Sequence, residues 1–131
     1  MSSNKITISD YYYKKTEIDT MMNGKANSSH THNTWTKITL WTNGNNNATL
    51  WVNEDIQLCN LKYYQKNVSV SSSEKTLHTG LIPISYRPSY TIISGCYNPH
   101  VSVAVTQDGS ILCVSTESTT RTVNGNLTWN Y

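Results

Sequence analysis

Alternating apolar and polar residues, separated by short turn signals, constrain the fold of this chain more than any other feature. Within 101–106, three valines alternate with smaller or polar residues, which is typical of a strand with one buried face. Asp108-Gly109 follows this segment, and Asn43-Gly44 separates two earlier segments of the same kind. Both dipeptides are typical of tight hairpin turns, so we expect neighbouring antiparallel strands.

The same periodicity extends over most of residues 34–131. Strict alternation in the first alternating segment places Trp35 and Trp41 on one face. The segment 117–126 is predicted to be a polar loop containing the turn signal Asn-Gly, and 74–80 is a polar patch between strands. We therefore expect a mainly β protein, an antiparallel β-sandwich of jelly-roll-like type. Its strands are predicted at 34–42, 48–53, 56–64, 68–70, 90–94, 101–106, 111–116 and 127–131.

The composition supports this fold class and excludes several functions. Ser, Thr and Asn make up more than a third of the chain, and these residues favour turns and strands over helices. The net charge of +2 gives no electrostatic basis for binding nucleic acid or a membrane surface. The sequence has no apolar run of about eighteen residues and no signal-peptide-like N-terminus. Cys59, Cys96 and Cys113 are odd in number and lack metal-like spacing, which favours reduced thiols.

A short helix is predicted before the strands, at 10–24. Thr16 and Asp19 have the spacing of a capping pair, and Gly24 provides a stop. At about ten residues the helix is shorter than the ~12–15 that an isolated helix needs in water. Its apolar stripe must therefore pack either on its own domain or against identical chains, as a brief coiled-coil collar. The stripe consists of Tyr11, Ile18, Met21 and Met22.

Two histidines follow the helix. In an extended segment His30 and His32 point to the same side, and imidazole is a common ligand of transition metals. One chain supplies two ring nitrogens, whereas three chains around an axis supply six, which suits octahedral coordination. The alternative is that both histidines are solvated in a polar linker.

The segment 11–32, Y-Y-Y-K-K-T-E-I-D-T-M-M-N-G-K-A-N-S-S-H-T-H, resembles one found repeatedly in tail-fibre and receptor-binding proteins of tailed phages and prophages. It covers about a sixth of the chain, and the later stretch from Ile84 to the N-G-N-L-T-W ending is similar to head domains of such fibres. The resemblance implies a parallel homotrimer and a place in the virion tail. Residues 1–33 would be leader, trimerising helix and linker, and residues 34–131 would be the head domain.

The same resemblance implies a metal site. Some fibres with a His-x-His motif hold metal ions on the trimer axis, so His30 and His32 of three chains would bind one Fe or Zn ion. Fibres known for this chemistry usually repeat the motif many times, whereas this chain has it once. The protein would be made in the host cytoplasm, without a signal peptide, and would join the rest of the tail fibre or baseplate.

The expected function is binding of a host cell-surface polysaccharide or glycoconjugate. Aromatic faces stack on the apolar side of sugar rings, and polar side chains bond to the hydroxyl groups. A structural fibre or baseplate component and a monomeric lectin-like cellular module are the alternatives. An enzyme is not expected, because His78 and His100 are isolated and no Gly-rich phosphate loop is present. The candidate sugar-binding residues are Trp35, Trp41, Trp51, Arg87 and Tyr97.

Overall fold

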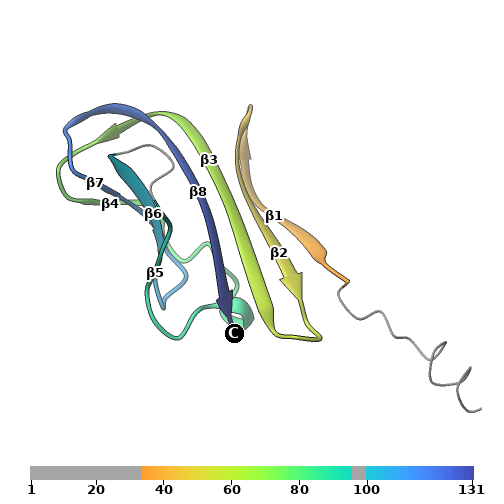
Figure 1. The fold of residues 1–131 in the computed structure, drawn as a ribbon. Coiled ribbons are helices and arrows are strands. Elements are labelled where there is room, and N and C mark those ends of the chain that lie inside the picture. The colour runs from red at the N-terminus through yellow and green to blue at the C-terminus, as the bar shows by residue number, and fades with distance from the viewer. Residues whose placement is uncertain (1–33, 96–99) are drawn as a thin grey trace, which may run out of the picture. The chain divides into compact units, whose positions relative to one another are not determined.

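Two four-stranded antiparallel sheets form the described part of the protein (Figure 1). The computed structural model describes residues 34–95 and 100–131. Sheet A has the order β1-β2-β3-β8, with β1 at Thr36–Asn43, β2 at Asn46–Asn53, β3 at Leu58–Val70 and β8 at Thr119–Asn130. Sheet B has the order β4-β7-β6-β5, with β4 at Glu74–His78, β5 at Ile92–Ile93, β6 at Val101–Val105 and β7 at Ile111–Ser115.

This architecture confirms the prediction of a mainly β protein built from antiparallel sheets. In sheet B, the meander β5-β6-β7 with β4 beside β7 is a Greek key. Sheet A instead contains the meander β1-β2-β3 with β8 added beside β3, so the similarity to a jelly roll is partial. The predicted helix at 10–24 lies outside the described residues. So do its stripe residues Tyr11, Ile18, Met21 and Met22, and the histidines His30 and His32.

Alternate residues of both sheets form the core. The buried side chains are mostly Val, Leu and Ile, and each stabilises the fold by ~1.5–3 kcal/mol relative to an exposed position. Strand β6 of sheet B packs on β8 of sheet A. The core residues of sheet A are Ala48, Leu50, Val52, Cys59, Leu61, Tyr63, Val68, Val70, Val123, Leu127 and Trp129. Those of sheet B are Val101, Val103, Val105, Ile111 and Cys113.

The β1–β2 hairpin follows the predicted turn, but β1 contains a bulge. Gly44 has a φ of 62°, a left-handed conformation that glycine adopts without strain. The register shifts between Thr39, which pairs with Thr49, and Trp41, which pairs with the buried Ala48. The extra residue turns Trp41 to the inner side of the sheet. The prediction that Trp41 shares a face with Trp35 is therefore wrong, because a bulge shifts the period-two alternation by one residue.

Strands β3 and β8 are the longest, and both extend beyond their predicted limits. The two strands predicted at 56–64 and 68–70 are one strand, interrupted by an irregularity between Gln65 and Val68. Strand β8 occupies most of the segment 117–126, which was expected to be a loop. Gly125 lies within this strand and pairs with Tyr63 instead of forming a turn. Strand β4 likewise occupies most of the polar patch at 74–80, where no strand was predicted.

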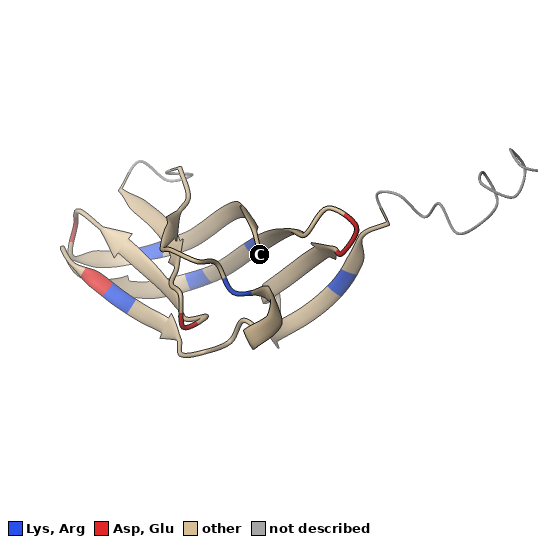
Figure 2. Ribbon diagram, turned by 90° about the horizontal axis from the view of Figure 1, so that it is seen from below, with Lys and Arg blue, Asp and Glu red and all other residues tan. Residues whose placement is uncertain are grey.

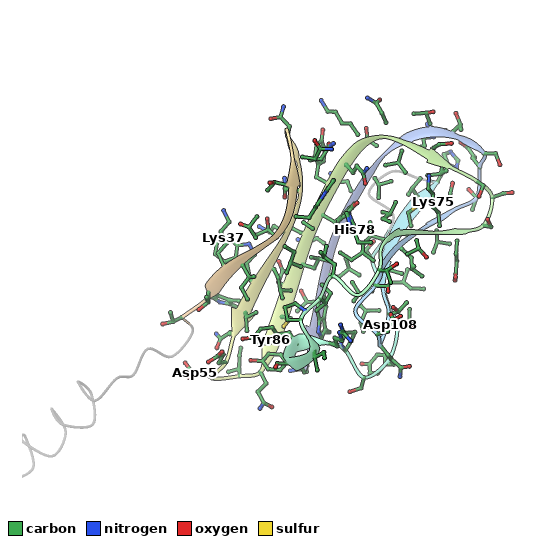
Figure 3. The ribbon with its side chains drawn as sticks, turned by 180° about the vertical axis from the view of Figure 1, so that it is seen from behind. Lys37, Asp55, Lys75, His78, Tyr86 and Asp108 are labelled. Carbon is green, nitrogen blue, oxygen red and sulfur yellow. The ribbon has the colours of Figure 1, made fainter. Side chains whose placement is uncertain are left out.

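A long connection between β4 and β5 closes one end of the sandwich. It contains the 3-10 turn η1 at Ile84–Tyr86, which begins after Pro83. The carbonyl of Tyr86 accepts a hydrogen bond of 2.7 Å from the indole Nε1 of Trp129, and its hydroxyl donates one of 3.1 Å to Glu54. Figure 3 labels Tyr86 on this turn, near the end of sheet A. The connection therefore covers Trp129 at this end and adds its own Ile82 to the core.

Candidate functional site

The outer face of sheet A carries a row of polar and aromatic side chains across all four strands. Leu50, Leu61 and Leu127 face the core, so the residue next to each of them in sequence points outward. The antiparallel register then aligns the outward residues side by side. The row consists of Lys37 of β1, Trp51 of β2, Asn60 of β3 and Thr128 of β8.

A depression of about 450 Å³ lies over this row. Two of the predicted sugar-binding residues, Trp35 and Trp51, line it together, although they are separated by the β1–β2 hairpin. Trp35 is 39% exposed and Trp51 is half-buried, so both offer ring surface to a ligand. The other lining residues are Leu58, Asn60, Lys62 and Thr128.

The amide of Asn60 holds the polar side of the depression in place. Its Nδ2 donates to Oδ1 of Asn126 at 2.6 Å and to Oγ1 of Thr128 at 2.9 Å. A third contact, of 3.3 Å, reaches the carbonyl of Leu127. Oδ1 of Asn60 has no hydrogen-bond partner among the described residues, and the Thr128 hydroxyl proton remains available. The site therefore presents an acceptor and a donor whose positions are fixed before a ligand arrives.

Two lysines flank the aromatic residues. The Nζ of Lys37 lies 5.8 Å from the ring centroid of Trp51, within range of a cation–π interaction. Lys62 is exposed on β3 and lines the depression. Strands β1, β2, β3 and β8 contain no Asp or Glu, and the described salt bridges all involve Glu117. Figure 2 shows basic residues on these strands and also on β4 and the β4–β5 connection, and acidic residues at turns and on β4.

A second depression, of about 270 Å³, continues along the same face. It shares Lys62 with the first depression and lies toward the opposite end of β3. Tyr64 contributes an aromatic ring, and its row partners Asn47 and Asn124 contribute amides. The two depressions therefore adjoin at Lys62 on the outer face of sheet A.

Two further predicted sugar-binding residues, Trp41 and Arg87, lie elsewhere. Trp41 stacks against Tyr63 with ring centroids 6.1 Å apart, and its centroid is 4.6 Å from that of His78. Arg87 donates from Nε to the carbonyl of Ile82 at 2.8 Å, so it braces the connection before β5. Tyr97 lies outside the described residues. The structure thus brings together two of the five candidates, Trp35 and Trp51.

Sheet B offers a weaker candidate. A depression of about 420 Å³ is lined by Thr76 of β4, by Leu112 of β7 and by polar residues of the adjoining loops, and no aromatic side chain lines it. Its carboxylate, Asp108, accepts hydrogen bonds from the Thr106 hydroxyl and from the Ser110 backbone amide. These hydrogen bonds, aided by the nearby charge of Arg87, hold the pKa of Asp108 below its usual value. Asp108 is therefore an ionised turn residue and unsuited to donating a proton.

Metal-binding and thiol chemistry have little basis in the part of the chain that the structure describes. No group of three or more His, Cys, Asp or Glu side chains gathers there in a way that would hold a metal ion. Cys59 and Cys113 are buried free thiols, as the sequence predicted for them. Burial raises the pKa of Cys59 to about 12, so this thiol stays protonated and unreactive.

Sequence reasoning missed Lys37, Asn60, Lys62 and Thr128 as site residues. Their signal is the alternation itself, because Asn60 and Lys62 occupy the polar positions of a strand whose apolar positions are buried. Thr128 was placed in a strand, but the segment before it was expected to be a loop. The pairing of β8 with β3, which completes the row, could not then be predicted.

Comparison with protein-family models, curated proteins and solved structures finds no match to this chain. Within residues 34–95 and 100–131, no helix is long and apolar enough to span a membrane. The function must therefore be argued from the geometry of this face and from the resemblance of the segment 11–32.

Proposed function

We propose that this chain is the distal module of a phage or prophage tail fibre and binds a host cell-surface polysaccharide or glycoconjugate through the outer face of sheet A. The observation that carries the proposal is the depression in which Trp35 and Trp51 lie beside the fixed amide of Asn60. The fibre identity rests on the resemblance of the segment 11–32. We propose binding without catalysis.

Each group in the depression has a role in sugar binding. The indole rings of Trp35 and Trp51 stack on the apolar faces of sugar rings, which removes apolar surface of both partners from water. Asn60 accepts a hydrogen bond from a sugar hydroxyl through Oδ1, and the Thr128 hydroxyl donates one. Because these polar groups are already ordered by their own hydrogen bonds, little conformational entropy is lost on binding.

The proposed assembly is a parallel homotrimer. Three linked heads multiply a weak single-site affinity, since the second and third binding events become intramolecular. The apolar stripe of the segment 10–24 would form the collar, and His30 and His32 of the three chains are the proposed ligands of an axial Fe or Zn ion. Native mass spectrometry tests this assembly. A mass of three chains of 14.8 kDa is expected, and a monomer would contradict it.

Tryptophan substitutions test the binding site. Trp51→Ala and Trp35→Ala should each weaken adsorption of the full chain to host cells by at least about tenfold, because buried Trp contacts dominate binding energies. Tyr90→Ala is the matched control, since Tyr90 is 68% exposed but does not line this depression. Circular dichroism would establish that each variant is folded. Unchanged adsorption of both tryptophan variants would refute a site on this face.

A further inference from the structure

We infer that the ligand is an anionic polymer of sugars or sugar derivatives, and that the ammonium groups of Lys37 and Lys62 bind its negatively charged groups. This inference rests on the proposed function, because it concerns the same face of sheet A. It specifies the chemical class of the ligand, which the aromatic residues alone leave open. The observation that carries it is the arrangement of the two lysines around Trp51 on a face without acidic strand residues.

The two lysines lack a countercharge. Lys37 and Lys62 take part in no ion pair among the described residues, where the salt bridges are His100–Glu117 and Arg121–Glu117. Their neighbours in the register are Trp51, Thr49 and Asn126, all uncharged. Two unpaired cations beside a binding surface attract anions and disfavour cationic ligands.

The spacing of the two lysines suits a ligand with more than one negative charge. Lys37 lies on β1 and Lys62 on β3, with β2 between them, and strands are ~5 Å apart, so the two positions are on the order of 10 Å apart. Charges repeated along a polymer can meet both lysines at once, and the second depression beyond Lys62 offers further surface to such a chain.

The polar groups of this face favour a polysaccharide over a nucleic acid. Nucleic-acid sites line up many Lys and Arg residues along the phosphates, whereas the two depressions are lined by a single lysine, Lys62, among amides and hydroxyls, with Lys37 beside Trp51. Asn60, Asn126 and Thr128 form a fixed array suited to hydroxyl groups. Single-stranded nucleic acid also stacks on aromatic rings, so its binding is measured in the same test.

An ammonium group is a point charge and does not distinguish a carboxylate from a phosphate by shape. The anion of the polymer can thus be the carboxylate of a uronic acid or the phosphodiester of a polyol-phosphate chain. The experiment has one arm for each source. Polygalacturonate supplies carboxylates, a glycerol-phosphate polymer supplies phosphodiesters, dextran supplies uncharged sugar, and poly(dT) supplies a nucleic acid.

Binding of the full-length protein to these four immobilised polymers tests the inference. We expect binding to polygalacturonate or to the glycerol-phosphate polymer, and binding to dextran and poly(dT) at least ~10-fold weaker. Lys37→Gln and Lys62→Gln should each lower the affinity ~3–10-fold. Lys75→Gln is the matched control, because Lys75 lies on β4 of sheet B (Figure 3). Raising NaCl from about 50 to about 300 mM should weaken wild-type binding and affect the double lysine variant less.

Three results overturn the inference. One is binding to dextran as tight as to the anionic polymers, with both lysine variants equal to wild type. Another is binding to neither anionic polymer, and the third is preferential binding to poly(dT). The Trp51→Ala variant distinguishes a failure of this inference from a failure of the proposed function. If Trp51→Ala still loses adsorption to host cells, the glycan site stands and only its charge preference is wrong; unchanged adsorption of Trp35→Ala and Trp51→Ala refutes both.

Discussion

Gly125 on β8 faces Val103 on β6 so closely that a side chain at Gly125 has no room. A Cβ atom added to Gly125 would lie 2.6 Å from the Cβ of Val103 and 2.7 Å from its Cγ2. Both residues are buried, and they belong to different sheets. The glycine is therefore required by the close approach of the sheets, although its dipeptide with Asn124 has the composition of a turn.

This contact predicts that Gly125→Ala destabilises the protein by about 1–3 kcal/mol, the usual range for overpacking a core. Val103→Gly, which removes both atoms nearest to the added Cβ, should lose stability on its own through a cavity, yet the double variant should be more stable than the sum of the two effects. Urea denaturation measures the free energies of unfolding. Gly95→Ala is the control, because a Cβ there meets nothing within 4 Å. Additive effects of the two substitutions would contradict the contact.

Trp41 and Trp51 should respond in opposite ways to substitution. Trp41→Ala removes a ring packed against Tyr63 and His78, so it should lower the free energy of unfolding by roughly 1–4 kcal/mol. Below its unfolding temperature this variant should bind cells or polymers as the wild type does. Trp51→Ala should lose binding with a much smaller loss of stability. If the folded Trp41→Ala variant lost binding, Trp41 would have to be part of the binding site.

His78 should make the protein less stable in mild acid. Its Nε2 lies 3.0 Å from the Tyr63 hydroxyl, and burial lowers the pKa of His78 below its ordinary value of 6.5. As the pH falls through that value, the unfolded chain binds a proton that the folded chain resists. Stability is therefore fully present above about pH 6.5 and is lost as the pH falls toward the folded-state pKa.

Urea midpoints measured between about pH 7.5 and pH 5 check this dependence. His78→Gln should be less stable at neutral pH, because the ring contacts are lost, but its midpoint should fall less with acidification. Wild type and His78→Gln are compared at every pH, so titrations elsewhere in the chain cancel. If the urea midpoints of the two proteins changed equally with pH, His78 would contribute nothing to the pH dependence of stability.

The buried thiols should be protected from modification. In a Cys96→Ser variant, Cys59 and Cys113 are the remaining cysteines, and both are fully buried. We expect a thiol reagent at about pH 8 to label neither residue in the native protein and both after denaturation, because the thiolate is the reactive form. Rapid labelling of the native protein would contradict the packing of the two residues between the sheets.

Much of the fold could be predicted from the alternation of apolar and polar residues, and each element that was missed has an identifiable physical cause. The hairpin at Asn43-Gly44 and the strand around Val103 were predicted because local sequence and burial agree there. Strand β8 was missed because its turn-like dipeptide and polar residues fit a loop equally well. Its structure depends on pairing with β3 over a long sequence separation, and local pattern does not report such pairing.

The candidate site was partly predictable for the same reason. Trp35 and Trp51 could be proposed from residue type, and the structure places both in one depression. Trp41 was misplaced because a bulge has no reliable sequence signal. Lys62 and Thr128 could not be added, since their neighbourhood exists only once β3 lies between β2 and β8.

The alternation along β3 separates the demands of folding from those of recognition. Leu61 and Tyr63 face the core, whereas Asn60, Lys62 and Tyr64 face outward from the same strand. Substitutions at the outward positions therefore change the ligand surface while the packed side of the strand remains as it is. Under the proposed function, exchange of these residues one at a time would alter which ligand is bound while the buried side chains of β3 stay the same.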